Sequence, residues 1–148
     1  MTVAQKNLKA FLLMIQYSEG TLGKDAYRML YGGALADDLS KHPNKKVTKW
    51  GLTSTAAGAY QMLNKTWQEI SQKLRLKDFS PQSQDRAAIE LIARRKALDD
   101  VMAGRFSQAI TKCRKEWASL PGAGYNQKEN NPKTLAQVYK AAGGTLVA

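Results

Sequence analysis

Apolar residues recur along the chain at spacings of three and four, the pattern typical of amphipathic helices. The first such stripe predicts a helix from about residue 3 to residue 18, formed by Leu8, Phe11, Leu12 and Ile15. Gly20 and Gly23 follow and end the pattern. The chain therefore opens with one long helix that has a single apolar face.

Helical periodicity returns near residue 64. Thr66 and Glu69 have the spacing of a capping box, and Asn64 offers a competing start for the same helix. Ser80-Pro81 is the signature of an N-cap followed by proline at the first helical position. The apolar stripe after it predicts one element that continues to Val101.

Two further helices are predicted in the last third of the chain. Gly104 ends the preceding element, and Ser107 is expected to cap a helix that carries a stripe of Ile110, Cys113 and Trp117. Asn131-Pro132 opens the last helix, and Gly143-Gly144 ends it. The pattern therefore predicts about five helices in total.

Residues 24–60 differ from the rest because they are rich in glycine and polar turn residues. Tyr27, Met29 and Tyr31 alternate with polar positions, which favours short strands or extended chain. A long irregular segment in a compact chain is usually functional or disordered, and the aromatic content of this one argues against disorder. We therefore expect a mostly helical α+β fold over residues 1–148, forming one domain, in which this irregular lobe makes one wall of a cleft.

The composition is that of a globular protein, with 43% hydrophobic and 24% charged residues in a chain of 148. The longest apolar run, from Ala10 to Ile15, is far shorter than the roughly 20 residues that span a bilayer. No small-residue cleavage site follows it, so we expect no secretory signal peptide. The sequence thus predicts a protein that is made in the cytoplasm, without stable membrane insertion.

A single cysteine, Cys113, and a single histidine, His42, restrict the available chemistry. They exclude an internal disulfide and argue against a zinc site built from Cys and His ligands. Cys113 lies on a helical stripe and is expected in the core, while His42 before Pro43 is expected to make a structural hydrogen bond. The sequence therefore implies neither a metal nor a cofactor.

The net charge is +11, from 23 basic and 12 acidic residues. Such a field speeds encounters with polyanions, either nucleic acid or an anionic cell-wall polymer. The basic residues are spread along the whole chain, whereas a nucleic-acid arm would concentrate them. We therefore expect no nucleic-acid partner, although a basic binding module without catalysis stays open as an alternative.

Glu19 stands where the first apolar helix stops, just before Gly20. Burial among apolar side chains disfavours a charged carboxylate, and a helix C-terminus does so too. Both effects favour a carboxyl group that keeps its proton near neutral pH. The alternative is an exposed acid at a frayed helix end.

Two loops carry small residues together with tyrosine and amide side chains, which offer fixed donors and acceptors to a ligand. The candidate binding residues in them are Ser54, Tyr60, Gln61, Tyr125 and Asn126. This chemistry suits sugars, and one acid beside two such loops is the minimum equipment for cutting a glycosidic bond. The alternative is that both tyrosines are buried with their hydroxyls bonded internally.

These stretches resemble the phage lambda-type endolysins, which are lytic transglycosylases of bacterial peptidoglycan. The resemblance runs from Lys9 to Gly144 and includes three strings, Ser18-Glu19-Gly20-Thr21, Leu76 to Pro81 and Trp117 to Tyr125. It implies a lysozyme-like fold, with a helical lobe, a small β lobe and a cleft between the two lobes.

The resemblance also implies a mechanism. Glu19 would protonate the glycosidic oxygen between N-acetylmuramic acid and N-acetylglucosamine, then accept the proton of the muramoyl C6 hydroxyl as that oxygen attacks the anomeric carbon. The product is a 1,6-anhydromuramoyl end. Intramolecular attack benefits from a high effective concentration, so one acid can suffice.

Two features bear on this mechanism. The phage lambda pattern has an aspartate after the tyrosine of its first loop, whereas Arg28 follows Tyr27 here, where it is a candidate contact for substrate carboxylates. Asp37 and Asp38 lie in the irregular lobe and could supply the second carboxylate of a hydrolytic lysozyme. Such a muramidase is the alternative to a transglycosylase.

The resemblance further implies the cellular setting. An endolysin without a signal peptide reaches the cell wall only after a second phage protein, a holin, has opened the membrane. The partners expected are peptidoglycan glycan strands and, functionally, that holin. We expect a monomer that stays in the host cytoplasm until its release to the periplasm.

Overall fold

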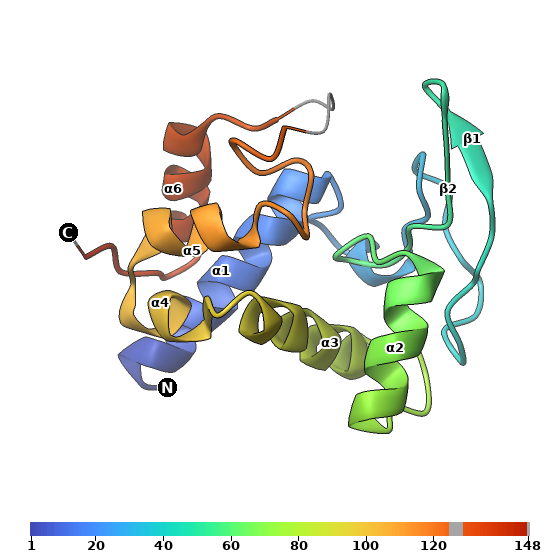
Figure 1. The fold of residues 1–148 in the computed structure, drawn as a ribbon, viewed down its shortest axis with the longest axis horizontal. Coiled ribbons are helices and arrows are strands. Elements are labelled where there is room, and N and C mark those ends of the chain that lie inside the picture. Colours follow the sequence, from blue (N-terminus) through green and yellow to red (C-terminus); the bar gives the residue numbers. More distant parts are fainter. Residues whose placement is uncertain (125–128, 148) are drawn as a thin grey trace. The chain divides into compact units, whose positions relative to one another are not determined.

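The computed structural model describes residues 1–124 and 129–147. Its elements in chain order are α1 (Val3–Glu19), the short 3-10 helix η1 (Ala26–Arg28), β1 (Val47–Lys49), β2 (Leu52–Ser54), α2 (Asn64–Leu74), α3 (Pro81–Arg94), α4 (Leu98–Ala103), α5 (Phe106–Cys113) and α6 (Pro132–Ala141). Helices dominate, and the described sheet is one antiparallel pair of short strands. The predicted α+β, mostly helical fold is confirmed (Figure 1).

The chain divides into two compact units. Unit 1 comprises Met1–Gly20 and the chain from Leu91 onward, and unit 2 comprises Thr21–Glu90. The helix α3 begins in unit 2 and ends in unit 1. A single domain over residues 1–148 stays a prediction.

Unit 1 is built around α1, which packs against α4 and α6 (Figure 1). The helix begins with a capping box, because Thr2 accepts a hydrogen bond from the Gln5 backbone and the Gln5 side chain accepts one from Thr2. Aromatic rings fill the core beneath it, with the Phe106 ring 6.0 Å from that of Phe11 and 4.7 Å from that of Tyr139. These contacts fix the axis of α1 and therefore the position of its last residue.

Unit 2 holds the β1–β2 hairpin, in which Val47 pairs with Ser54 and Lys49 pairs with Leu52. Its core centres on Phe79, whose ring makes an edge contact with Trp67 at 4.7 Å. His42 also packs on Phe79, and its Nε2 lies 2.9 Å from the carbonyl oxygen of Met62. The structural hydrogen bond predicted for His42 is thus confirmed, and burial lowers the pKa of this imidazole.

The start of α2 differs from the capping box predicted at Thr66. The helix begins at Asn64, the competing start, and Leu63 at the N-cap makes no side-chain capping bond. The Asn64 N–H instead donates to the Thr55 hydroxyl at 3.0 Å. A hydroxyl from outside the helix therefore satisfies one of the backbone donors that the first turn leaves without an intrahelical partner.

The single element predicted from Ser80 to Val101 is wrong, because the structure separates α3 from α4. Lys96 adopts a left-handed conformation with φ of 58°, which turns the chain between the two helices. The helix α5 starts at Phe106, so Ser107 lies inside it and is not its cap. The predicted Asn131 cap of α6 is confirmed, since its side chain accepts a bond from the Lys133 N–H.

The expected core residues are buried. Trp67, Trp117 and Cys113 are almost inaccessible, and burial raises the pKa of the Cys113 thiol to about 12. This thiol is therefore unreactive at neutral pH. Within residues 1–124 and 129–147, no helix combines the length and apolar character that crossing a membrane requires.

Candidate active site

Glu19 is the last residue of α1, and its carboxyl group is partly buried. Gly20 closes the helix with φ of 78°, and its N–H donates to the carbonyl oxygens of Gln16 and Tyr17. Burial raises the pKa of Glu19 from 4.5 to about 7, and a hydrogen bond from Ser119 opposes this rise more weakly. A substantial fraction of Glu19 therefore carries a proton at neutral pH, as a general acid requires.

A chain of hydrogen bonds leads to the Glu19 carboxylate. The Ser119 hydroxyl donates to Glu19 Oε2, and the Ser18 Oγ lies 2.7 Å from the Ser119 Oγ. Asn130 Nδ2 donates to the Ser18 Oγ at 3.1 Å and to the Ser18 carbonyl oxygen at 3.0 Å. The Ser119 hydroxyl has one hydrogen and donates it to Glu19, so the Ser18 hydroxyl must be the donor to Ser119. Every hydrogen bond of the chain is therefore donated in the direction of the carboxylate.

The same chain fits the protonated acid. A serine hydroxyl rotates and can accept where it previously donated, so Glu19 can donate to Ser119, and Ser119 to Ser18. The Ser18 Oγ then accepts from both Ser119 and Asn130. The network can hold the carboxyl group in one place in both protonation states, which suits a residue that gives up a proton and then takes one back.

Core residues position Ser119. Trp117 and Leu120, on either side of it in sequence, are 2% and 0% exposed. The Asn130 N–H donates to the Ser119 carbonyl oxygen at 2.8 Å, and the Glu129 carboxylate accepts from the Gly122 and Gly124 N–H groups. Our sequence reasoning missed Ser119 and Asn130 as site residues. The available signal was the match from Trp117 to Tyr125, which carried the resemblance but gave Ser119 no role.

Removal of the Ser119 hydroxyl gives a testable shift. Its hydrogen bond lowers the pKa of Glu19, so Ser119→Ala is expected to raise that pKa further above 7. The acid form then persists to higher pH, and the alkaline limb of the pH–rate profile moves upward. Ser18→Ala is the graded comparison, since Ser18 reaches Glu19 only through Ser119 and is expected to move the limb less. A limb that moves downward or stays fixed in Ser119→Ala contradicts this role.

Tyr60 is 1% exposed, and its hydroxyl donates to Asp85 Oδ1 at 2.6 Å. The Tyr27 hydroxyl donates to the same oxygen at 2.9 Å, and the two rings meet edge to face. The alternative of a buried tyrosine with an internally bonded hydroxyl thus describes Tyr60. The sequence pattern did not single out Asp85, whose carboxylate accepts from both phenol hydroxyls in unit 2.

The other candidate binding residues also make hydrogen bonds within unit 2. Gln61 Nε2 donates to the carbonyl oxygens of Met29 and Gly58, at 3.0 and 2.9 Å. The Ser54 Oγ accepts from the Ala56 N–H at 3.0 Å, while Gln61 and Ser54 both stay partly exposed. Arg28 Nε donates to the Ala36 carbonyl oxygen at 2.9 Å. The last two candidates, Tyr125 and Asn126, lie outside the described residues.

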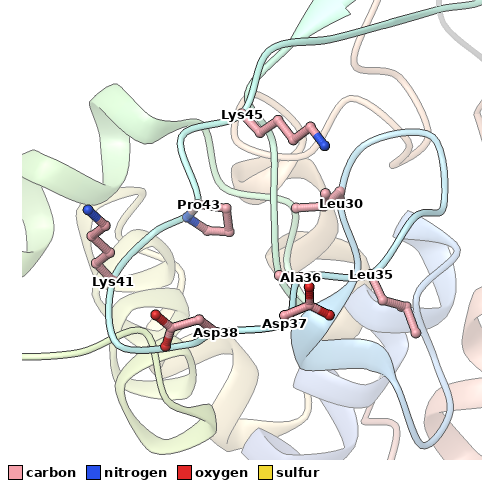
Figure 2. A pocket seen from close by; sticks show the side chains of 8 residues that line it. All are labelled: Leu30, Leu35, Ala36, Asp37, Asp38, Lys41, Pro43 and Lys45. Atoms are coloured by element: carbon pink, nitrogen blue, oxygen red, sulfur yellow. The ribbon is translucent and has the colours of Figure 1, made fainter.

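Asp37 and Asp38 line a pocket formed by unit 2 alone (Figure 2). Its walls also include apolar residues and two lysines, namely Leu30, Leu35, Ala36, Pro43, Lys41 and Lys45. The Asp38 carboxylate accepts hydrogen bonds from the Ser40 N–H and hydroxyl, at 2.8 and 2.9 Å, which lower its pKa. Asp38 therefore stays ionised at neutral pH and holds a turn of this loop.

Metal chemistry was not implied by the sequence. In the part of the chain that the structure describes, no three His, Cys, Asp or Glu side chains gather as they would around a metal ion.

The chain is similar to known proteins over nearly its whole length. A family model described as Endolysin matches residues 9–146. The endolysin of Escherichia phage lambda is 46% identical over 145 residues, covering 93% of this chain and 92% of its own, and that of Escherichia phage P2 is 44% identical, covering 94% of each.

Two solved structures also match nearly the whole chain. The structure of bacteriophage lambda lysozyme complexed with a chitohexasaccharide has a TM-score of 0.91 at 45% identity, covering 96% of this chain and 97% of its own. A second structure of lysozyme from bacteriophage lambda has a TM-score of 0.87 at 44% identity, with the same coverage. The lysozyme-like fold is therefore shown, and the chain belongs to the endolysin family of lysozyme-like phage enzymes of peptidoglycan degradation.

Proposed function

We propose that this protein cleaves the β-1,4 bond between N-acetylmuramic acid and N-acetylglucosamine in peptidoglycan by lytic transglycosylation. The observation that carries the proposal is Glu19, whose partly buried carboxyl group has a pKa of about 7 and is held by Ser119. Such a group can exist as acid and as base at one working pH, which a single-residue mechanism requires.

The reaction uses one carboxyl group twice, first as acid and then as base. Protonated Glu19 donates to the glycosidic oxygen as the bond from the anomeric carbon to that oxygen breaks. The resulting carboxylate then accepts the proton of the muramoyl C6 hydroxyl, whose oxygen bonds to the same anomeric carbon. The new 1,6-anhydro ring forms and Glu19 ends protonated, so no water is consumed.

The similarity to a lysozyme complexed with a chitohexasaccharide supports a glycan substrate. Within unit 2, we propose sugar contacts for the partly exposed Ser54 and Gln61, with Tyr60 and Asp85 holding the surrounding chain in place. We also propose sugar contacts for Tyr125 and Asn126, and a contact of the exposed Arg28 with substrate carboxylates. Released protein would reach the wall after a holin has opened the membrane.

Hydrolysis is the alternative reaction, and the two give different products. Digested peptidoglycan analysed by mass spectrometry is expected to contain muropeptides with anhydro ends, which are lighter by one water than reducing ends. Asp37→Asn and Asp38→Asn are expected to leave this product pattern and its rate unchanged. Reducing ends as the main product, lost on substitution of either aspartate, would establish a muramidase instead.

A further inference from the structure

The turn of the β1–β2 hairpin holds Trp50 in a strained backbone conformation. Its φ is 53°, and Gly51 after it has φ of 75°. Two successive positive φ angles are typical of a hairpin turn that asparagine and glycine normally occupy. The Trp50 residue is 77% exposed, so burial within the chain does not offset the strain. Strain that internal packing leaves uncompensated points to a role outside the chain.

Two neighbouring side chains hold the Trp50 ring in this exposed position. The Tyr31 ring meets it edge to face at 5.7 Å between centroids, and Lys49 Nζ lies 5.2 Å from its centre. Both partners are themselves fixed, because the Tyr31 hydroxyl donates to the Lys49 carbonyl oxygen and Lys49 Nζ donates to the Gly32 carbonyl oxygen. Leu52, the residue after Gly51, is 42% exposed. The hairpin turn thus presents a pre-ordered apolar edge.

The chain segment that contains the hairpin carries charge of one sign. From Leu39 to Gln68 the chain has no acidic residue and five lysines. Three of them, Lys45, Lys46 and Lys49, are exposed on or just before β1. Tryptophan and tyrosine prefer the boundary between lipid and water, and clustered lysines are attracted to anionic headgroups.

We propose that the β1–β2 hairpin docks on an anionic phospholipid surface. Trp50 and Leu52 enter the headgroup region, and Lys45 and Lys46 lie against lipid phosphates. Docking of this kind is peripheral and reversible, and it needs no membrane-crossing helix. A glycan strand is the weaker candidate at this edge, since its sugar rings carry no charge to complement the exposed lysines.

Vesicle binding by the full-length protein tests the proposal. Vesicles of equal parts phosphatidylglycerol and phosphatidylcholine are expected to co-sediment the protein, and vesicles of phosphatidylcholine alone are not. Molar salt is expected to release it, because screening shortens to about 3 Å. Trp67 and Trp117 are 4% and 2% exposed, so a blue shift of tryptophan emission on binding reports mainly on Trp50.

Two variants with the same loss of charge locate the surface. Lys45→Gln combined with Lys46→Gln is expected to weaken vesicle binding on the order of 20-fold, from about fivefold per lysine. Lys6→Gln combined with Lys9→Gln removes two exposed lysines of α1 and is expected to weaken binding far less. Equal losses in the two double variants would show general charge attraction and overturn the proposal.

Trp50→Asn separates docking from folding. Asparagine before glycine suits this turn, so the thermal midpoint is expected to stay unchanged or rise, while vesicle binding falls at least severalfold. Retained vesicle binding in Trp50→Asn overturns the proposal. So does a wild-type emission that shifts with soluble chitohexasaccharide but not with anionic vesicles, because the edge would then be a sugar contact.

Discussion

Glu19→Gln is expected to lower the rate of peptidoglycan cleavage on the order of a thousandfold, the range for loss of a general acid. Glutamine keeps the size of the side chain and can still accept a hydrogen bond from Ser119, but it has no proton to give to the glycosidic oxygen. The measurement is the clearing of outer-membrane-permeabilised cells, followed by turbidity at matched protein concentrations.

Glu90→Gln is the matched control for this result. It makes the same chemical change at an ion pair with the exposed Lys73 in unit 2, where a surface pair contributes little. Clearing by Glu90→Gln is expected to equal that of the wild type. If Glu19→Gln clears cells as fast as the wild type, acid catalysis through Glu19 is wrong.

The same substitution is expected to stabilise the protein at alkaline pH. The pKa of Glu19 is about 7 in the folded chain against an ordinary value of 4.5, so the folded state binds the proton more tightly. Stability from this group is complete below pH 4.5 and is lost as the pH rises through 7. At about 1.4 kcal/mol per pKa unit, the upper bound of the loss is roughly 3.5 kcal/mol, and partial exposure reduces it.

Thermal unfolding at two pH values checks this linkage. Near pH 8, Glu19→Gln is expected to melt above the wild type, because glutamine carries no charge that burial penalises. Near pH 4 the gain is expected to vanish, since Glu19 is then protonated in the folded and unfolded chains alike. A gain of equal size at both pH values would contradict the role of the buried carboxylate.

Gly58→Ala is expected to destabilise the protein by about 3 kcal/mol or more, from steric overlap and backbone strain together. Gly58 has φ of 85°, and a Cβ there would lie 2.3 Å from Gln84 Oε1 and 2.8 Å from Phe79 Cζ. Gln84 cannot retreat easily, because its side chain accepts from the Ala59 N–H and donates to the Tyr27 and Phe79 carbonyl oxygens. The thermal midpoint is expected to fall by about 10 °C.

Gly51→Ala isolates the steric part of this effect. Gly51 has a similar φ of 75°, but no atom of the described chain lies within 4 Å of the Cβ that alanine would add there. Its loss is expected to be about 1 kcal/mol, the cost of the left-handed conformation alone. Equal thermal midpoints for the two variants would show that Gln84 and Phe79 yield to the new methyl group.

The position of Glu19 and several features of the fold follow from the local sequence pattern. The apolar stripe of α1 and the glycine after it place an acid at a helix end, and the structure confirms that position for Glu19. The Asn131 cap and the burial of Trp67 and Trp117 were likewise predicted from local patterns, and the structure confirms them. Such features depend on neighbours within a few residues, so they can be recognised before the fold is known.

Other features have no local signal. The Asn64 N–H donates to the Thr55 hydroxyl, and the Tyr60 hydroxyl donates to Asp85, although Tyr60 could equally have been expected to face a ligand. The break between α3 and α4 depends on the left-handed conformation of Lys96. Lysine is not a residue type that predicts a turn. In each case the partner or the conformation is chosen by packing.

The sequence by itself determined where the acid stands, which helices form around it and which aromatic residues are buried, because periodicity and caps act over a few residues. Only the tertiary structure decided what the acid touches. Ser119 and Asn130 lie about a hundred positions from Glu19 and Ser18, and only the folding of unit 1 brings them within hydrogen-bonding distance. The proton affinity of Glu19 depends on that meeting and on burial, neither of which is encoded at position 19 alone.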